Sequence, residues 1–382
     1  MAESVQSVGF LDYFSGLRDP RQAGKVLYPL KEVMLVVLCG VLAGADDFVE
    51  IALWGGTNLD FLRRFLPFTR GIPSHDALND LFNALDHEAF RDSFIAWAQS
   101  LRVATGKQPG SDALVAIDGK TSRRTGDAAK GRPALHLLSA WAAEQRLVLG
   151  QEAVETKENE IVAIPRLLAM LELKGALVTI DAMGCQKTIA RTIHEKGADY
   201  LLPVKDNQPA LKQDIELFFT EQRACGFANA KAFFHQTVDN DHGRLEIRRH
   251  WSTADIAWLV ERHDWTALTS IAMIERQTER NGKFDITRHF YIASLPADAV
   301  LLARAARTHW QIENSLHWVL DVVFHDDLSR LRSGNGPQNL AVVRHIALNL
   351  LKQAQGKLSL KGTRKKAAWS PEFLQTVIRG TT

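Results

Sequence analysis

The stretch Leu114-Val-Ala-Ile-Asp118-Gly-Lys-Thr121 sets the fold class that we expect, because a short apolar run leads directly into an acidic residue. Such a run is typical of a buried strand, and the polar residues that follow are typical of the point where a strand leaves its sheet. Leu177-Val-Thr-Ile-Asp181 has the same pattern. The sequence therefore predicts two neighbouring strands of one sheet, with Asp118 and Asp181 at their ends and close together.

The residues around these two runs alternate between strand and helix patterns. Three strand candidates come first, with a tight turn at 143–146 between the second and the third, and strand–helix units follow. This order predicts an α/β fold whose core is an RNase H-like mixed sheet. The strand candidates are 114–117, 135–142, 147–153, 176–180 and 200–203, and the helix candidates are 161–173 and 187–196.

Five segments of different character divide the chain. Gly106–Gly110 contains Pro109 and separates a helical pattern from the first strand, since Gly and Pro interrupt helices. After residue 208 the alternation gives way to β-rich runs, with turns expected at 241–243 and 281–282. We expect an N-terminal helical domain (1–105), the first part of the RNase H-like core (111–208), a β-rich insertion (209–295), a C-terminal helical part of the core (296–355) and a basic C-terminal tail (356–382).

A third carboxylate, Glu313, lies inside a long helical pattern over 297–324. His309, Glu313, His317 and Asp321 follow one another at four-residue spacing, so they share one edge of the predicted helix. That edge presents several groups that could bind a metal.

Composition alone does not select a partner. The chain has 382 residues and is 46% hydrophobic, which is enough for a sizeable core in one large or two to three smaller domains. A net charge of +2 and a pI near 8.4 do not by themselves require nucleic acid. Residues 326–382, however, carry ten Lys and Arg against three Asp and Glu, whereas residues 1–110 carry ten against thirteen. The basic end is therefore the C-terminal one.

Cys39, Cys185 and Cys225 form no CxxC pair, so neither a disulfide framework nor a cysteine zinc site is indicated, and a reducing compartment fits. The first residues lack the basic and apolar regions of a signal peptide. The apolar stretch Val33–Ala45 is too short to span a bilayer and predicts a buried core helix.

Two aspartates after strands and a glutamate from a helix are suited to phosphoryl transfer by two metal ions. Mg²⁺ prefers oxygen ligands, and a shared carboxylate with one further carboxylate for each ion can hold two of them. Placement favours Asp118 as the shared ligand, flanked by Asp181 and Glu313. Each aspartate alone could instead be an ordinary turn residue after a strand.

Several blocks of the sequence resemble the ISAs-type, H-repeat-associated transposases of bacterial insertion sequences, and the resemblance covers most of the chain. The longest block is His309–Phe324, which contains Glu313. The other blocks are Ile117–Thr121, Lys157–Glu160, Thr179–Met183, Asp241–Arg244, Phe14–Arg21 and Gly71–His75.

The resemblance implies a DDE transposase with an RNase H-like core and the triad Asp118, Asp181 and Glu313, which act as catalytic residues and metal ligands. It implies two Mg²⁺ ions in each active site, with Mn²⁺ able to substitute. The implied partner is double-stranded DNA, both the inverted-repeat ends of the element and the target, bound by a homodimer or a higher oligomer. Action in the bacterial cytoplasm, at the nucleoid and without a membrane, would follow.

One departure concerns the residues around the third carboxylate. Related hairpin-forming transposases carry Tyr, Arg and Lys at the positions of Ala306, His309 and Leu320. Only Glu313 matches that pattern, so the resemblance does not indicate how the second DNA strand is handled.

Basic and polar residues near these motifs are candidates for DNA contact, because Lys and Arg bind phosphates. Lys120, Arg123 and Arg124 follow Asp118 directly, although they could form a solvated loop. Residues 157–160 could orient DNA or cap a helix, and a tryptophan of the insertion (Trp251, Trp258 or Trp265) could stack on an unpaired base or belong to a core. The predicted DNA-binding residues are Lys120, Arg123, Arg124, Lys157, Asn159, Arg244, His309, His317 and Lys365.

Two other functions compete with that of an active transposase. A domesticated or inactive relative would bind DNA as a regulator without cutting it, but an intact set of three carboxylates favours an active enzyme. A glycosidase with a carboxylate pair explains neither the third carboxylate nor the basic residues beside Asp118.

Overall fold

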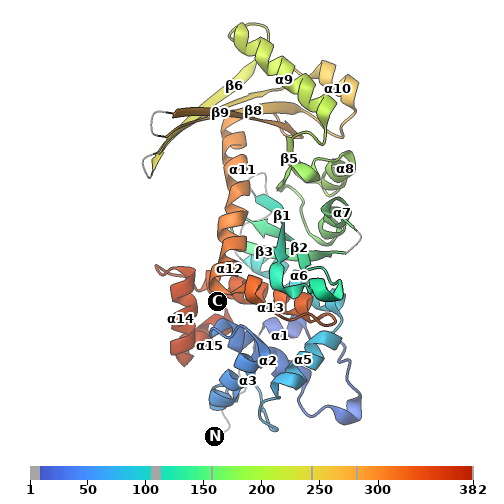
Figure 1. Ribbon diagram of the computed structural model, residues 1–382, viewed down its shortest axis with the longest axis vertical. Helices are drawn as coiled ribbons and strands as arrows, with labels where there is room; N and C mark the ends of the chain where they lie inside the picture. Colours follow the sequence, from blue (N-terminus) through green and yellow to red (C-terminus); the bar gives the residue numbers. More distant parts are fainter. Residues whose placement is uncertain (1–8, 105–112, 156–157, 242–243, 281–282, 381–382) are drawn as a thin grey trace.

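The computed structural model describes residues 9–104, 113–155, 158–241, 244–280 and 283–380. The molecule is elongated, with helices at one end and the broad strands of a sheet at the other (Figure 1). Helix α11 (Ala299–Ile312) runs along the molecule between these two ends (Figure 1). The turns expected at 241–243 and 281–282 and the boundary at 106–110 lie largely or wholly outside the described residues.

A single mixed sheet of nine strands, in the order β3-β2-β1-β4-β5-β9-β8-β7-β6, organises the described part of the chain. Strands β1, β4 and β5 are mutually parallel, and the other pairings are antiparallel. The strands are β1 (Leu114–Ser122), β2 (Leu135–Ala142), β3 (Leu147–Val154), β4 (Leu177–Ile180), β5 (Asp199–Val204), β6 (Ala232–Asp241), β7 (Arg244–Thr253), β8 (Ser270–Arg280) and β9 (Lys283–Ala293). The predicted mixed α/β architecture with N-terminal helices is confirmed.

The register of β1 and β4 brings the two aspartates side by side. Ile117 pairs with Ile180, so Asp118 and Asp181 are the next residues on adjacent parallel strands. The expectation that Asp118 ends its strand is wrong, because β1 continues to Ser122 through antiparallel pairing with β2 after β4 has ended. At Asp118, β1 therefore pairs with β2 but no longer with β4. Asp118 lies beside the place where β4 has ended.

Alternate residues of the central strands pack into two different layers. Val115, Val178 and Leu202 join a core with helices α7 (Glu160–Met170) and α8 (Lys187–Glu195). The preceding residues of these strands, Leu114, Leu177 and Leu201, instead meet Leu302 and Ala305 of α11. Helix α11 thus covers the face of the sheet opposite α7 and α8.

The helices from the two ends of the chain share one core. Helix α2 is buried along almost its whole length and contacts α13, α14 and α15, and α6 packs on β3. Among the described helices, none has the length and apolar character needed to cross a membrane. The N-terminal helices are α1 (Phe10–Tyr13), α2 (Leu30–Leu42), α3 (Phe48–Thr57), α4 (Leu59–Leu62), α5 (His75–Ala84) and α6 (His87–Ala104), and the C-terminal ones are α13 (Gly336–Gln353), α14 (Leu360–Trp369) and α15 (Pro371–Arg379).

The segment 356–382, predicted as a basic C-terminal tail, is folded into α14 and α15 over most of its length. Arg364 of α14 is buried, and its guanidinium donates hydrogen bonds to the carbonyl oxygens of Val41 and Val323. These bonds satisfy backbone acceptors at the ends of two other helices. Positive charge in this segment therefore includes a structural cation.

The segment 209–295 contains two helices as well as strands. Helix α9 (Pro209–Ala224) buries Leu211, Ile215 and Phe219, which recur at four-residue spacing, and α10 (Ala257–His263) follows β7. The interpretation of 209–231 as part of a β-rich region overlooked this helical periodicity. Because β9 pairs with β5, the strands of this segment extend the central sheet and do not form a separate one.

Candidate active site

A cavity of about 410 Å³ lies where β1, the end of β4 and α11 meet. Asp118, Asp181 and Glu313 all line it, although they are far apart in the sequence. Its other lining residues are Thr179, Ile180, Ala182, Leu201, Pro203, Lys205, His289, Tyr291, Ala306, His309, Trp310 and Ile312. The fold thus brings together the three carboxylates that the sequence singled out.

The long helix predicted over 297–324 is interrupted at the site. Glu313–His317 form one π-helical turn between α11 and α12 (Trp318–Val323), a local widening that is frequent at functional sites. His317 is buried, and its Nδ1 lies 2.9 Å from Glu313 Oε2 and 3.7 Å from Asp118 Oδ2. The turn therefore directs Glu313 and His317 toward the carboxylate on β1.

A lysine from α13 supports this turn. Lys352 Nζ donates a 2.9 Å hydrogen bond to the carbonyl oxygen of Ser315 and lies 4.3 Å from the centre of the Trp141 ring. Burial, with a smaller effect of Arg146, lowers the pKa of Lys352 to about 7. Nothing in the sequence pattern pointed to Lys352, because its partners come from distant segments.

The carboxylates perturb one another. Burial, with added repulsion from Asp181 and Glu313, raises the pKa of Asp118 to about 6 despite the opposing effect of His317. The pKa of Asp181 is also raised, mainly by burial and further by Glu160, although the backbone N–H of Gly184 donates a hydrogen bond to Asp181 Oδ1. Negative charge at this site is incompletely compensated by the protein itself.

The donor set fits a divalent cation. Asp118, Glu313 and His317 each offer an atom within 4.8 Å of the others, and Asp181 lines the same cavity. Carboxylate oxygens are the ligands that Mg²⁺ prefers, and a cation would offset both the burial and the repulsion that raise the pKa of Asp118. Of the two ring nitrogens of His317, Nδ1 is the one that faces the carboxylates of Asp118 and Glu313.

A second acidic cluster is already filled by a lysine. Lys120 Nζ lies 2.7 Å from Asp321, 3.2 Å from Asp326 and 3.3 Å from Asp327. Asp326 is buried and is also paired with Arg344 at 2.6 Å. The ammonium of Lys120, which was predicted to contact DNA phosphate, is thus held inside the protein by three carboxylates.

The other predicted DNA-binding residues differ in their position and in their exposure to solvent. Arg123 and Arg124 are exposed beyond β1, and Asn159 is exposed at the start of α7. His309 lines the cavity and bonds through Nδ1 to the Thr179 hydroxyl at 3.1 Å, and burial lowers its pKa to about 4. Lys365 is exposed on α14, at the helical end of the molecule (Figure 1). Lys157 and the side chain of Arg244 lie outside the described residues.

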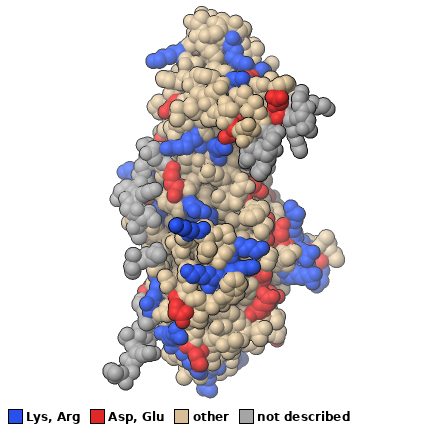
Figure 2. Space-filling model, turned by 90° about the vertical axis from the view of Figure 1, so that its left-hand side faces the viewer, with Lys and Arg blue, Asp and Glu red and all other residues tan. Residues whose placement is uncertain are grey.

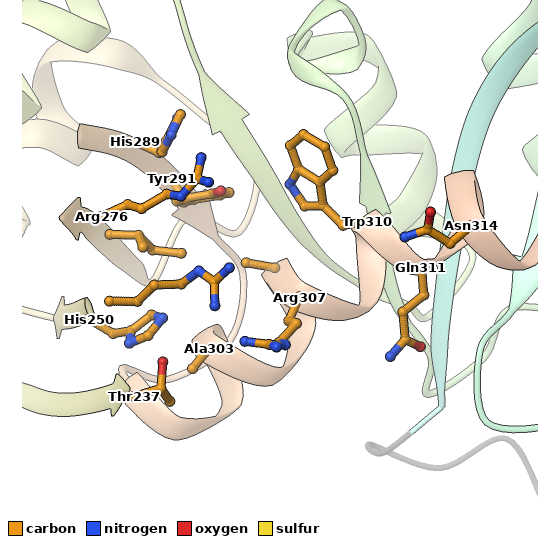
Figure 3. Close-up of a pocket in the computed structure, with 13 residues that line it drawn as sticks. Thr237, His250, Arg276, His289, Tyr291, Ala303, Arg307, Trp310, Gln311 and Asn314 are labelled. Carbon is orange, nitrogen blue, oxygen red and sulfur yellow. The ribbon is translucent and has the colours of Figure 1, made fainter. Parts of the chain in front are cut away.

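The exposed tryptophan at the site is not one of those considered from the sequence. Trp251 and Trp265 are buried, and Trp258 stacks on Phe218. Trp310 is 72% exposed and projects from α11 beside a second cavity, of about 340 Å³, that adjoins the first. Figure 3 shows Trp310 on α11 and, across this cavity, side chains such as His289 from the strands of the sheet.

Positive side chains gather on one face of the molecule. Figure 2, which views the left-hand side of Figure 1, shows Lys and Arg concentrated around the middle of that face, with acidic side chains more scattered. Such a surface suits a polyanion.

Comparison with known proteins agrees with this geometry. Residues 11–98 match the family described as "DDE_Tnp_1-associated", and residues 109–350 match the family described as "Transposase DDE domain". "Putative transposase YncI" of Escherichia coli O157:H7 is 39% identical over 380 residues, which cover 98% of this chain and 95% of the relative. "H repeat-associated putative transposase YhhI" of Escherichia coli K12 is 35% identical over 377 residues, which cover 97% and 98% respectively. The chain therefore belongs to the transposase DDE domain family, among the H repeat-associated transposases.

Proposed function

We propose that this chain cuts DNA at the inverted-repeat ends of an insertion sequence and joins the resulting 3′-hydroxyl ends to target DNA. The observation that carries the proposal is the convergence of Asp118, Asp181 and Glu313 on one cavity, from β1, from the end of β4 and from the π turn. Family membership names the class of enzyme, and this convergence supports the chemistry.

Asp118, Asp181 and Glu313 would hold two Mg²⁺ ions, with Mn²⁺ able to replace them. When bound, the ions supply Lewis acidity that stabilises the charge developing on the phosphate and activates the attacking hydroxyl or water. The chain itself fixes the ligands: the N–H of Gly119 donates to Asp118 Oδ1 at 2.9 Å, and His317 holds Glu313. Pre-positioned ligands lower the reorganisation needed when substrate binds.

The architecture supports an RNase H-like catalytic core. Three antiparallel strands (β3, β2 and β1) continue into the parallel strands β4 and β5, with helices on both faces. In this proposal 111–208 and 296–355 form the core, 209–295 contributes an insertion that extends the sheet, and 1–105 helps to bind the ends.

Duplex DNA would approach through its phosphates. The exposed residues Arg123, Arg124, Asn159 and Lys365 are proposed contacts, as are Lys157 and Arg244. Because Lys120 is already paired with carboxylates, we assign it no phosphate contact. Pairing of two ends before joining requires two active sites, so at least a dimer on DNA is proposed.

The test is cleavage of DNA that carries the candidate terminal repeats flanking the gene, in Mg²⁺ or Mn²⁺. The native chain is expected to nick at the repeat boundary, and Asp118→Ala and Glu313→Gln are expected to bind these ends without nicking. Glu261→Gln, an exposed carboxylate on α10, is the matched control and should cut normally. Binding without any nicking by the native chain would instead identify a DNA-binding regulator.

A further inference from the structure

A fourth carboxylate lies beside the proposed active site. Glu160, in the first turn of α7, packs against the backbone of β1 at Gly119, the residue that follows Asp118. A methyl group on Gly119 would collide with Glu160 Oε1 and with His136 Nε2. The glycine thus leaves room for the Glu160 carboxylate close to a proposed metal ligand.

Hydrogen bonds from two strands fix Glu160 in this place. His136 Nε2 on β2 lies 2.6 Å from Glu160 Oε1, and His136 Nδ1 lies 2.8 Å from the hydroxyl of Thr121 on β1. The Glu160 carboxylate accepts from Nε2–H, and the other ring nitrogen, Nδ1, is within hydrogen-bond distance of the threonine hydroxyl. The chain Thr121–His136–Glu160 therefore fixes the position of this carboxylate.

Glu160 also lies near the segment that carries the second aspartate. Helix α7 contacts Ala182–Gly184, which directly follow Asp181. Glu160 does not line the cavity that holds the three carboxylates but lines a separate open groove of about 840 Å³, together with His136 and Asn159. A carboxylate at this place adds negative potential near Asp118 and Asp181 without occupying a ligand position.

Helix stabilisation explains only part of this arrangement. A carboxylate in a first helical turn interacts favourably with the positive end of the helix dipole, and Glu160 has that position. This interaction requires neither the two-step hydrogen-bond chain to Thr121 nor a glycine at position 119. Both features instead hold the Glu160 carboxylate against the strand that carries Asp118.

We propose that Glu160 is a positioning residue that raises the affinity of the Asp118–Asp181 site for divalent cations. It does so through its charge, which the Thr121–His136 chain holds at a fixed place against β1 next to Asp118 and near the residues that follow Asp181. Residues that surround metal ligands typically change metal affinity by roughly 10- to 100-fold when they are replaced. The inference rests on the proposed function for the purpose of the metal, but it concerns binding alone.

The test is Mn²⁺ binding to the metal-free full-length chain, measured by isothermal titration calorimetry. Glu160→Gln keeps the shape of the side chain and removes its charge, so we expect about tenfold weaker binding. Gly119→Ala keeps the charge but displaces it and should weaken binding in the same direction. Glu158→Gln is the matched control, since Glu158 lies two residues away and pairs with Arg166, and its affinity should equal that of the native chain.

Circular dichroism and the unfolding temperature in the absence of metal show whether each variant is folded. The proposal is overturned if folded Glu160→Gln binds Mn²⁺ as tightly as Glu158→Gln, or if the native chain binds no Mn²⁺ at a site that Asp118→Asn removes. Failure of the proposed function has a different signature, because the native chain would then bind Mn²⁺ in a Glu160-dependent way and still cut no DNA.

Discussion

Replacing Lys120 by Met separates a structural role from a DNA-binding one. The ammonium is the common partner of Asp321, Asp326 and Asp327, and its side chain is only 10% exposed. Removing one partner of a buried ion pair costs about 3–5 kcal/mol. Asp326 keeps Arg344, and Asp321 and Asp327 are partly hydrated, so the lower end of that range, about 3 kcal/mol, is expected.

The assay is urea unfolding at pH 7.5, followed by circular dichroism. Lys130→Met is the control, because Lys130 is exposed in the connection between β1 and β2 and should change the free energy of unfolding by less than about 0.5 kcal/mol. Burial alone would lower the pKa of Lys120, but the three carboxylates outweigh it and raise that pKa. The contribution of Lys120 is therefore fully present below its unfolded pKa and is lost only as the pH rises through the raised folded value. A Lys120→Met chain as stable as Lys130→Met, but defective in DNA binding, would refute the structural role.

Three further changes have defined outcomes. Without metal, Asp118→Asn should raise the free energy of unfolding by about 3 kcal/mol at pH 7.5 and by almost nothing below pH 4. Protonation of Asp118 stabilises the fold below its unfolded pKa, and this stabilisation is lost as the pH rises through about 6; urea unfolding at both pH values measures the difference. Lys352→Met leaves the Ser315 carbonyl without its donor and should slow single-turnover cleavage about tenfold, whereas exposed Lys357→Met should not. Arg364→Met removes the guanidinium hydrogen bonds to the carbonyl oxygens of Val41 and Val323 and should cost about 3 kcal/mol, with trypsin cutting α14 faster than in the native chain. Equal digestion would contradict the docked arrangement.

Local sequence patterns predict most strands and the positions of both aspartates, because neighbouring residues determine these features. An apolar run that ends at Asp118 or Asp181 needs no distant partner to be recognised as a buried strand. The same reasoning placed the end of β1 too early, since the last residues of that strand are held by pairing with β2, which hydropathy does not report. The helical pattern around Glu313 is recognisable, but the π turn that aims this residue is held by Lys352 of α13, a distant partner that the local pattern does not report.

The residues that sequence reasoning misplaced are those whose partners lie far along the chain. Lys120 meets carboxylates about 200 positions away, and Arg364 meets Val41 across more than 300. In the sequence alone, Lys120 resembles a DNA contact because it lies next to an aspartate of the proposed site. Arg364 resembles one because it lies in a basic segment near a chain end. Only the tertiary fold reveals that each is a buried cation with internal acceptors.

The measurement that most directly tests the joint action of the three carboxylates is single-turnover cleavage of a pre-bound repeat end in Mg²⁺. The rates to compare are those of the native chain, Asp118→Asn, Glu313→Gln and the double variant. Groups that act as one unit lose most of the rate when any member is removed, so we expect a fall of about 10³-fold or more for each single change and no further fall for the double variant. A single variant that keeps a tenth or more of the native rate, or two effects that multiply in the double variant, would contradict the account.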